Sequence, residues 1–180
     1  SRLKELPDGV FRHISYLDYE NSIYQTHLTM TKKGDALTFD FTGTSPQAPA
    51  VINCTYAGLR AGLLTVILEY LCYDMPWCPA GAMRAADIVS EPGTVIHAKW
   101  PAGVCKATTA AGWAVLNTTG TCVSKLLAAS DQYRKRAMAL WKGASIVEEL
   151  FGTNQRGEPF GASILDFMAG GGGARSFKDG

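Results

Sequence analysis

One apolar segment limits what this chain can fold into more than any other feature. Residues 56–73 carry two charged side chains, Arg60 and Glu69, while large aliphatic residues recur among them at helical spacing. Such a segment is apolar nearly all round and predicts a buried helix, with Asn53 or Thr55 as its N-terminal cap. Its most apolar part, residues 61–71, is far shorter than the ~20 residues needed to cross a bilayer.

The rest of the chain predicts an α+β fold, with antiparallel strands at both ends and two long, largely buried helices. Runs of β-branched and aromatic residues between turn residues indicate strands, and a second run with helical spacing indicates another helix. We expect a single unit over residues 1–180. The expected strands cover residues 10–17, 23–31, 36–41, 94–97, 144–150 and 163–169, and the second helix covers residues 108–130. A glycine-rich hairpin at residues 152–161 separates the last two strands.

The charges argue against two classes of partner. The chain has 17 Lys and Arg against 16 Asp and Glu, which gives a net charge of +1. That balance produces no strong field to gather nucleic acid or anionic lipid, so we expect neither a nucleic-acid nor a membrane partner. Charged residues make up 18% of the chain, below the ~25% typical of soluble domains. Another protein surface is therefore expected to cover part of the exterior.

Cysteine and histidine content bears on the compartment and on metal binding. Five cysteines, an odd number without a Cys-x-x-Cys pair, favour a reducing compartment, and we expect a cytoplasmic protein. The three histidines show no metal-ligand spacing, so we expect no metal site built from this chain alone. His13 and His27 approach each other if the first two strands pair, although separate positions are the commoner outcome. Cys105 is reactive if it lies at a helix N-terminus, although burial is commoner for cysteine.

The segment at residues 40–47 has the composition of a binding site. A predicted strand ends at Asp40, and a glycine turn then presents hydroxyl groups ahead of the predicted buried helix. Small polar groups at such a junction commonly orient a substrate. The alternative is that they only satisfy the backbone groups of the turn. The candidate substrate-binding residues here are Asp40, Thr42, Gly43, Thr44, Ser45 and Asn53.

A second candidate lies in the run of four glycines at residues 170–173, followed by Arg175. Serial glycines let backbone N–H groups approach an anion, and Arg175 can bind a carboxylate or a phosphate if this loop borders a site. The run lacks the Gly-Lys-Ser/Thr ending of a nucleotide-binding loop, so a hinge or a loop that passes close to a neighbour is the commoner explanation. No catalytic set can be assigned, because no Ser-His-Asp arrangement or nucleophile elbow is present.

Several of these stretches, taken in order, resemble the B-subunit of the hydantoinase and oxoprolinase family. Each stretch is modest alone, but their joint order across nearly the whole chain is specific. The stretches are Leu-Pro-Asp-Gly at 6–9, Asp-Phe-Thr-Gly-Thr-Ser-Pro-Gln at 40–47, Ile-Asn at 52–53, Glu-Pro-Gly-Thr at 91–94, Pro-Ala-Gly-Val at 101–104, Gly-Gly-Gly-Gly-Ala-Arg at 170–175 and Asp-Gly at 179–180. The family includes N-methylhydantoinases, 5-oxoprolinases, and acetone and acetophenone carboxylases.

The resemblance implies part of a large ATP-dependent enzyme. In this family an A-type, ATP-binding subunit activates the substrate by phosphorylation, and the B-type part completes hydrolysis or carboxylation. We therefore expect two partners, a hydantoinase-A-like subunit and the remainder of this chain's own subunit. ATP and a divalent metal are implied for the complete enzyme and none for this chain alone, because the family's metal-binding cluster precedes the stretch that matches residues 6–9.

The favoured function is part of a cyclic-amide hydrolase acting on substrates of the hydantoin or 5-oxoproline class. The equivalent part of an ATP-dependent ketone carboxylase is the alternative within enzymes, and a non-catalytic scaffold module is the alternative outside them. Since the chain reads as an internal part of a larger subunit, we expect it to be inactive alone and to expose apolar surface. Four aromatic residues beside turns are expected at that boundary, namely Trp77, Trp100, Phe160 and Phe167.

Overall fold

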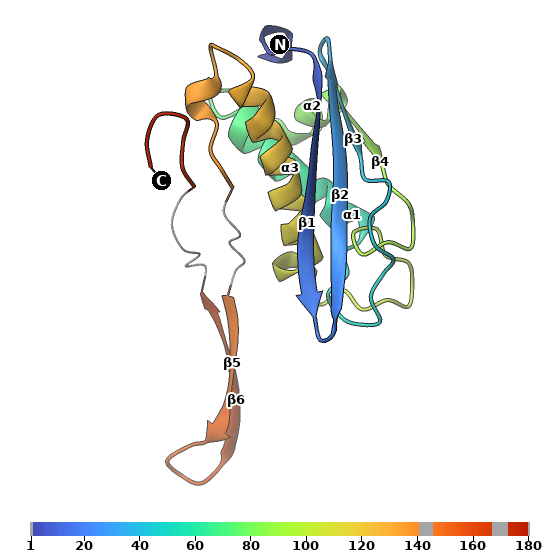
Figure 1. Cartoon of the computed structure of the whole chain (residues 1–180). Coiled ribbons are helices and arrows are strands. Elements are labelled where there is room, and N and C mark those ends of the chain that lie inside the picture. The colour runs from blue at the N-terminus through green and yellow to red at the C-terminus, as the bar shows by residue number, and fades with distance from the viewer. Residues whose placement is uncertain (1, 141–145, 167–172, 180) are drawn as a thin grey trace.

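The computed structural model describes residues 2–140, 146–166 and 173–179. Within these ranges helices and sheets are mixed (Figure 1), which confirms the predicted α+β class. In chain order the strands and α-helices are β1 (Gly9–Tyr19), β2 (Ser22–Lys33), β3 (Ala36–Asp40), α1 (Tyr56–Val66), α2 (Pro79–Ala82), β4 (Ala86–Val89), α3 (Ala111–Ala128), β5 (Ile146–Thr153) and β6 (Pro159–Asp166).

The main sheet has the strand order β1-β2-β3-β4. β1, β2 and β3 form an antiparallel meander with two-residue turns, since Tyr19 pairs with Ser22 and Lys33 with Ala36. These strands confirm the three predicted for the first part of the chain, within two residues at each end. β4 adds to β3 in parallel, which the sequence analysis did not anticipate.

The prediction of a strand over residues 94–97 was wrong. The strand, β4, comes before the turn at residues 91–93 instead of after it. Gly93 has a φ of 96°, and its N–H donates to the carbonyl of His97 at 2.8 Å. The segment therefore curls back on itself and makes isolated bridges, Thr94 with Pro46 and with His97, in place of a ladder.

The two faces of the sheet differ in burial. Along β2, Leu28 and Met30 are buried against the helices, while the alternate residues are half exposed. Lys32 lies on the buried face, where its ammonium donates to the carbonyl oxygen of Leu6 and to the carboxylate of Asp8, the latter at 2.8 Å. This bond, with a second from the N–H of Gly34, holds the pKa of Asp8 below its ordinary value.

Helices α1 and α3 lie on the buried face of the sheet. α3 packs on β1 and β2, and α1 packs beside α3 (Figure 1). Leu63, Val66 and Leu127 are fully buried, as predicted. α3 confirms the second predicted helix. It begins three residues later and ends two residues earlier than the predicted range 108–130.

Helix α1 begins as predicted, because the side chain of Thr55 accepts a hydrogen bond from the N–H of Gly58. It continues beyond Val66 as a π-helical turn, Ile67–Leu71, so helical backbone covers most of the predicted range. The expectation of burial nearly all round was wrong, because Arg60 and Ala61 are exposed. Small residues make that face apolar in composition without burying it.

Strands β5 and β6 form a separate hairpin that projects away from the main sheet (Figure 1). Phe151 pairs with Gly161, and Gly152 pairs with Phe160. A Cβ added at Gly152 would lie 3.1 Å from the ring of Phe160, and one at Gly161 would lie 3.4 Å from the ring of Phe151. Each aromatic ring thus packs over the glycine on the opposite strand, where the absence of a side chain leaves space for the ring.

The predicted hairpin is confirmed, although β5 and β6 extend further into residues 152–161 than expected and leave only residues 154–158 as their connection. The predicted strand residues 144–145 and 167–169 lie outside the described ranges.

Three of the four aromatic residues expected at a boundary are exposed. Trp100 keeps 94% of its surface accessible and Trp77 keeps 79%, and Phe160 is also exposed. Phe167 lies outside the described ranges. Within those ranges no helix has the length and hydropathy to cross a bilayer.

Candidate functional site

The turn after β3 is formed by its own polar residues. The carboxylate of Asp40 accepts a hydrogen bond from the N–H of Thr42 at 2.9 Å, which ends the strand in an Asx turn. Gly43 follows with a φ of 89°, a conformation that favours glycine, and the N–H of Thr44 donates to the carbonyl of Phe41 at 3.2 Å. Thr42 and Gly43 are exposed, whereas Thr44 is buried.

Thr44 and Ser45 attach this turn to β2. The backbone N–H of Gln25 donates to the hydroxyl oxygen of Ser45 at 2.8 Å, and that of His27 donates to the hydroxyl oxygen of Thr44 at 3.1 Å. In return the N–H of Ser45 donates to the carbonyl of Gln25 at 2.9 Å. The two hydroxyl groups therefore replace backbone carbonyls in continuing the sheet beyond the end of β3.

Asn53 holds together the loops that follow. Its side chain is fully buried, and its amide oxygen accepts from the N–H of Ala48 at 2.6 Å. Its amide nitrogen donates to the carbonyls of Ala48, Ala50 and Gly103 at 2.8–3.0 Å. The amide oxygen and the amide nitrogen of Asn53 are thus both bonded to backbone, the two N–H groups being shared among three carbonyls, of which that of Gly103 is 50 residues away in sequence.

The loop after β3 and the loop after β4 are interlocked by further backbone bonds. The N–H of Val95 donates to the carbonyl of Ser45 at 3.0 Å, and the N–H of Cys54 donates to the carbonyl of Val95 at 2.7 Å. The amide oxygen of Gln47 accepts from the N–H of Lys99 at 2.9 Å. An open hollow of about 520 Å³ lies between residues 47–51 and residues 101–103. We call this hollow the loop hollow.

A small set of polar groups stays available at the turn after β3 itself. The hydroxyl of Thr42 and the N–H of Gly43 have no hydrogen-bond partner in the part of the chain that the structure describes. The ring of His27 lies next to them, since a Cβ at Gly43 would be 3.5 Å from its Nδ1. Its Nε2 is 2.9 Å from the amide oxygen of Gln25. An acid, a hydroxyl, an N–H and an imidazole are therefore gathered at one turn.

The sequence analysis did not assign His27 and Gln25 to this site, although a signal existed. Thr29 pairs with Asp40, so alternation along β2 places residues 25, 27 and 29 on the same outer face of the sheet as Asp40. His13 pairs with Leu28 and lies on the opposite, inner face, so the two histidines do not approach each other. Burial, and Lys125 beside it, lower the pKa of His13 below its ordinary value.

The described residues do not provide a metal site. No group of three or more His, Cys, Asp or Glu side chains in these ranges is placed to hold a metal ion. The thiols of Cys54 and Cys122 are buried, which raises their pKa to about 11 and about 12 respectively, and neither is a thiolate near neutral pH. Cys105 is exposed and precedes α3 by several residues, separated from it by a 3₁₀ turn.

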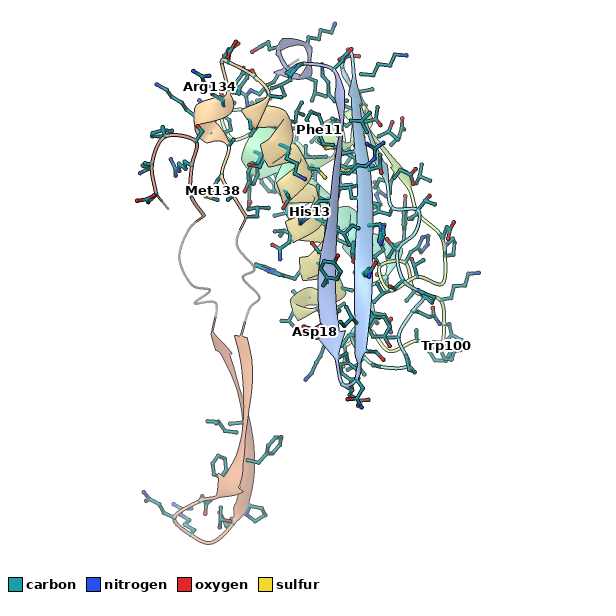
Figure 2. All side chains as sticks on the ribbon, in the orientation of Figure 1. Phe11, His13, Asp18, Trp100, Arg134 and Met138 are labelled. Carbon is teal, nitrogen blue, oxygen red and sulfur yellow. The ribbon has the colours of Figure 1, made fainter. Side chains whose placement is uncertain are left out.

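Arg175 lies in another part of the molecule. Its N–H donates to the carbonyl of Lys178 at 2.9 Å, and it forms an isolated bridge with Met138. Figure 2 shows Met138 far from Trp100, which adjoins the loop hollow. The structure thus brings Asp40, Thr42 and Gly43 together with His27 but leaves Arg175 apart from them.

Gly173, the described member of the glycine run, passes close to another segment. The N–H of Ala139 donates to the carbonyl of Ala174 at 2.8 Å, and a Cβ at Gly173 would overlap the carbonyl oxygen of Ala139. A close approach of two backbones, one of the two explanations offered for the run, accounts for glycine at this position.

A family model for hydantoinase B/oxoprolinase matches residues 1–180. The chain belongs to this family. It is 23% identical over 184 residues to the acetophenone carboxylase delta subunit of Aromatoleum aromaticum, a match that covers 99% of this chain and 26% of that subunit.

Two solved structures share the fold of this family member. A nucleotide-free acetone carboxylase superposes with a TM-score of 0.76 at 16% identity, over 98% of this chain and 25% of the other. An ATP-dependent caprolactamase from Pseudomonas jessenii superposes with a TM-score of 0.64 at 21% identity, over 93% of this chain and 28% of the other. The chain therefore spans about a quarter of the length of these relatives.

Proposed function

We propose that this chain is part of the B-type subunit of an ATP-dependent cyclic-amide hydrolase, and that the turn at residues 40–43 binds the amide. Its relatives include an ATP-dependent caprolactamase on the hydrolase side and acetone and acetophenone carboxylases on the other. The observation that carries the proposal is the pairing of a free donor with an acidic acceptor in that turn.

A cyclic amide is held in the cis form, so its C=O and its N–H lie on the same side of the ring. Recognition of both groups requires a donor and an acceptor side by side. The N–H of Gly43 and the hydroxyl of Thr42 supply donors, and the Asp40 carboxylate, bonded by one oxygen to the N–H of Thr42, supplies the acceptor. A ketone has only an acceptor oxygen and would leave the second carboxylate oxygen of Asp40 without a partner from the substrate, an arrangement that costs binding energy.

The chemistry also requires groups outside these residues. An amide nitrogen and an enolate oxygen are poor leaving groups, and phosphorylation from ATP on a hydantoinase-A-like partner would activate the substrate. Among the described residues no group of side chains is placed to hold a metal ion. The role of this turn is to orient the activated ring, for which positioning and electrostatics are the main contributions.

The test uses the complete enzyme with its partner subunit. ATP consumption is measured with hydantoin, 5-oxoproline and caprolactam in the absence of bicarbonate, and with acetone and acetophenone in its presence. Turnover of a cyclic amide without bicarbonate supports the proposal. Strict bicarbonate dependence assigns the carboxylase alternative, and the absence of any ATP turnover assigns the scaffold alternative.

Two variants test the turn itself. Asp40→Asn keeps the shape of the side chain but removes its charge, and is expected to raise KM for the amide about tenfold, the effect of one charge-assisted hydrogen bond. The control is Thr38→Val, one pleat earlier on the same face of β3. Equal kinetics for Asp40→Asn and the parent enzyme would contradict the role of this turn.

A further inference from the structure

A second hollow lies at the other end of the molecule from the loop hollow. It has a volume of about 280 Å³, and three cationic and two tyrosine side chains are among the residues that line it. We call it the basic hollow. The lining residues that matter here are Glu69, Tyr70, Tyr73, Lys135, Arg136 and Arg175. Figure 2 shows Arg134 and Met138, which adjoin it, beside the C-terminal segment and away from Trp100.

The backbone around the basic hollow is fixed by specific contacts. The hydroxyl of Ser124, on α3, donates to the carbonyl of Met138 at 2.6 Å and accepts from its N–H at 2.8 Å. Met138 in turn bridges to Arg175, and the segment of Arg175 is held by the close crossing at Gly173. Three segments distant in the sequence are thereby held around one space, and the arginine of the glycine-rich run is placed there.

Two guanidinium groups stack on the ring of Tyr73, but only one of them has a carboxylate partner among the described residues. Arg2 lies 4.5 Å from the ring centroid, and its charge is neutralised by both carboxylate oxygens of Asp74, at 2.6 and 2.7 Å. Arg136 lies 4.2 Å from the same centroid. Within the described ranges Arg136 has no carboxylate partner.

Lys135 and Arg175 likewise have no carboxylate partner in the part of the chain that the structure describes. Glu69 is the acidic residue among those lining the basic hollow, so three cations exceed the acidic charge by two. Burial, and Glu69 beside it, raise the pKa of Tyr70, so its hydroxyl remains a donor near neutral pH. An excess of two positive charges with arginine forks matches a dianion that accepts several hydrogen bonds.

We propose that the basic hollow binds the phosphate group of a small phosphorylated molecule, with Lys135, Arg136 and Arg175 as its ligands. A phosphate monoester carries about −1.5 to −2 charge near neutral pH and offers three acceptor oxygens, which fits this excess better than a singly charged carboxylate. The rings of Tyr70 and Tyr73 also line the hollow and offer an apolar surface to an organic group attached to the phosphate. This site is separate from the amide-binding turn and does not rest on its function.

The experiment is calorimetric titration of the complete protein that carries this chain, with inorganic phosphate and phenyl phosphate as probes. Sodium chloride at matched ionic strength reports non-specific screening. Saturable binding of both probes, tighter for phenyl phosphate, supports the proposal. Tighter binding of inorganic phosphate would assign the hollow to free phosphate, and the absence of saturable binding of either probe would overturn the proposal.

Variants locate the binding. Arg136→Gln and Arg175→Gln are each expected to weaken phosphate binding about tenfold, because each removes a charge-assisted contact. The matched control is Arg134→Gln, in the same 3₁₀ turn as Arg136 but outside the lining of the hollow and 3.6 Å from Asp131. Equal weakening in all three would show diffuse attraction and overturn a specific site. If one lining variant does not fold, Lys135→Gln replaces it.

Discussion

Asn53 and the basic hollow both bring polar groups together, but the polar groups around Asn53 are bonded to one another, whereas the cations of the basic hollow lack carboxylate partners among the described residues. The Asn53 amide is fully buried, and each of its atoms is engaged with backbone. The basic hollow instead leaves Lys135, Arg136 and Arg175 without carboxylate partners among the described residues. Satisfied polar groups determine a backbone arrangement, whereas charges in excess are available for a ligand.

The comparison predicts where substitutions affect stability and where they affect binding. The buried, hydrogen-bonded side chain of Asn53 should contribute strongly to the free energy of unfolding. The cationic side chains of the basic hollow should contribute little or nothing to the free energy of unfolding.

The largest effect is expected for Asn53→Ala. The substitution leaves the N–H of Ala48 and up to three carbonyls buried without a partner, and should lower the free energy of unfolding by about 3 kcal/mol or more. Urea denaturation of the complete protein measures it. The control is Asn117→Ala on α3, whose side chain makes no hydrogen bond within the described ranges. It should change the free energy of unfolding by no more than about 0.5 kcal/mol in either direction. Equal losses in the two variants would show that the hydrogen bonds of Asn53 contribute no more to stability than a side chain without them.

A smaller effect is expected at Arg2, the partnered one of the two arginines on Tyr73. Arg2→Gln removes the ion pair with Asp74 and the bond to the carbonyl of Leu71. It should lower the free energy of unfolding by about 1 kcal/mol, since Asp74 is half exposed and the pair is partly screened. A midpoint of thermal unfolding unchanged from the parent would contradict a stabilising role for this contact.

The pH dependence of stability is expected to involve His13, which is partly buried and has no anionic partner in the part of the chain that the structure describes. Its pKa in the folded protein lies below the ordinary value of 6.5, first through burial and then through Lys125. The neutral form is therefore favoured by folding, so its contribution to stability is present above pH 6.5 and is lost as the pH falls through the lowered pKa. His13→Gln should flatten this part of the stability profile. An unchanged slope in the variant would exclude His13 as its source.

The smallest effect on stability is expected for Arg136→Gln. The substitution loses a cation–π contact but also relieves repulsion from Lys135 and Arg175, so the net change should stay within about 0.5 kcal/mol. Chemical denaturation of this variant beside Arg2→Gln compares the two guanidinium groups on one ring. A loss for Arg136→Gln as large as that for Arg2→Gln would indicate that Arg136 is structural.

The sequence predicted the elements well where a single local pattern determined them. The meander of β1, β2 and β3 follows from alternation and two-residue turns, and α1 and α3 follow from apolar spacing and the Thr55 cap. The parallel pairing of β4 with β3 escaped prediction because it depends on contacts between residues about fifty positions apart. The strand predicted over residues 94–97 failed for the same reason. The backbone hydrogen bonds of this segment go to other loops or stay within the segment.

For the candidate site, the sequence identified the turn at residues 40–45 but not the state of each side chain. A sequence shows that Asn53, Thr44 and Ser45 are polar, but not that backbone groups already occupy them. His27 lies beside the turn because of the register in which β2 pairs with β3, and this register is a tertiary property. The three cations of the basic hollow come together through the crossing at Gly173, a tertiary contact with no local signal beyond the glycine itself.

The parallel β3–β4 pair has a consequence for the order in which the protein folds. The meander closes through turns of two residues, so its strands can pair as soon as they leave the ribosome. β4 must wait until the intervening α1 segment has been synthesised and has collapsed, because closing a long loop is entropically costly before its contacts form. During that interval the outer edge of β3 is unpaired, and we expect this edge to be the stretch of the nascent chain that most depends on chaperones.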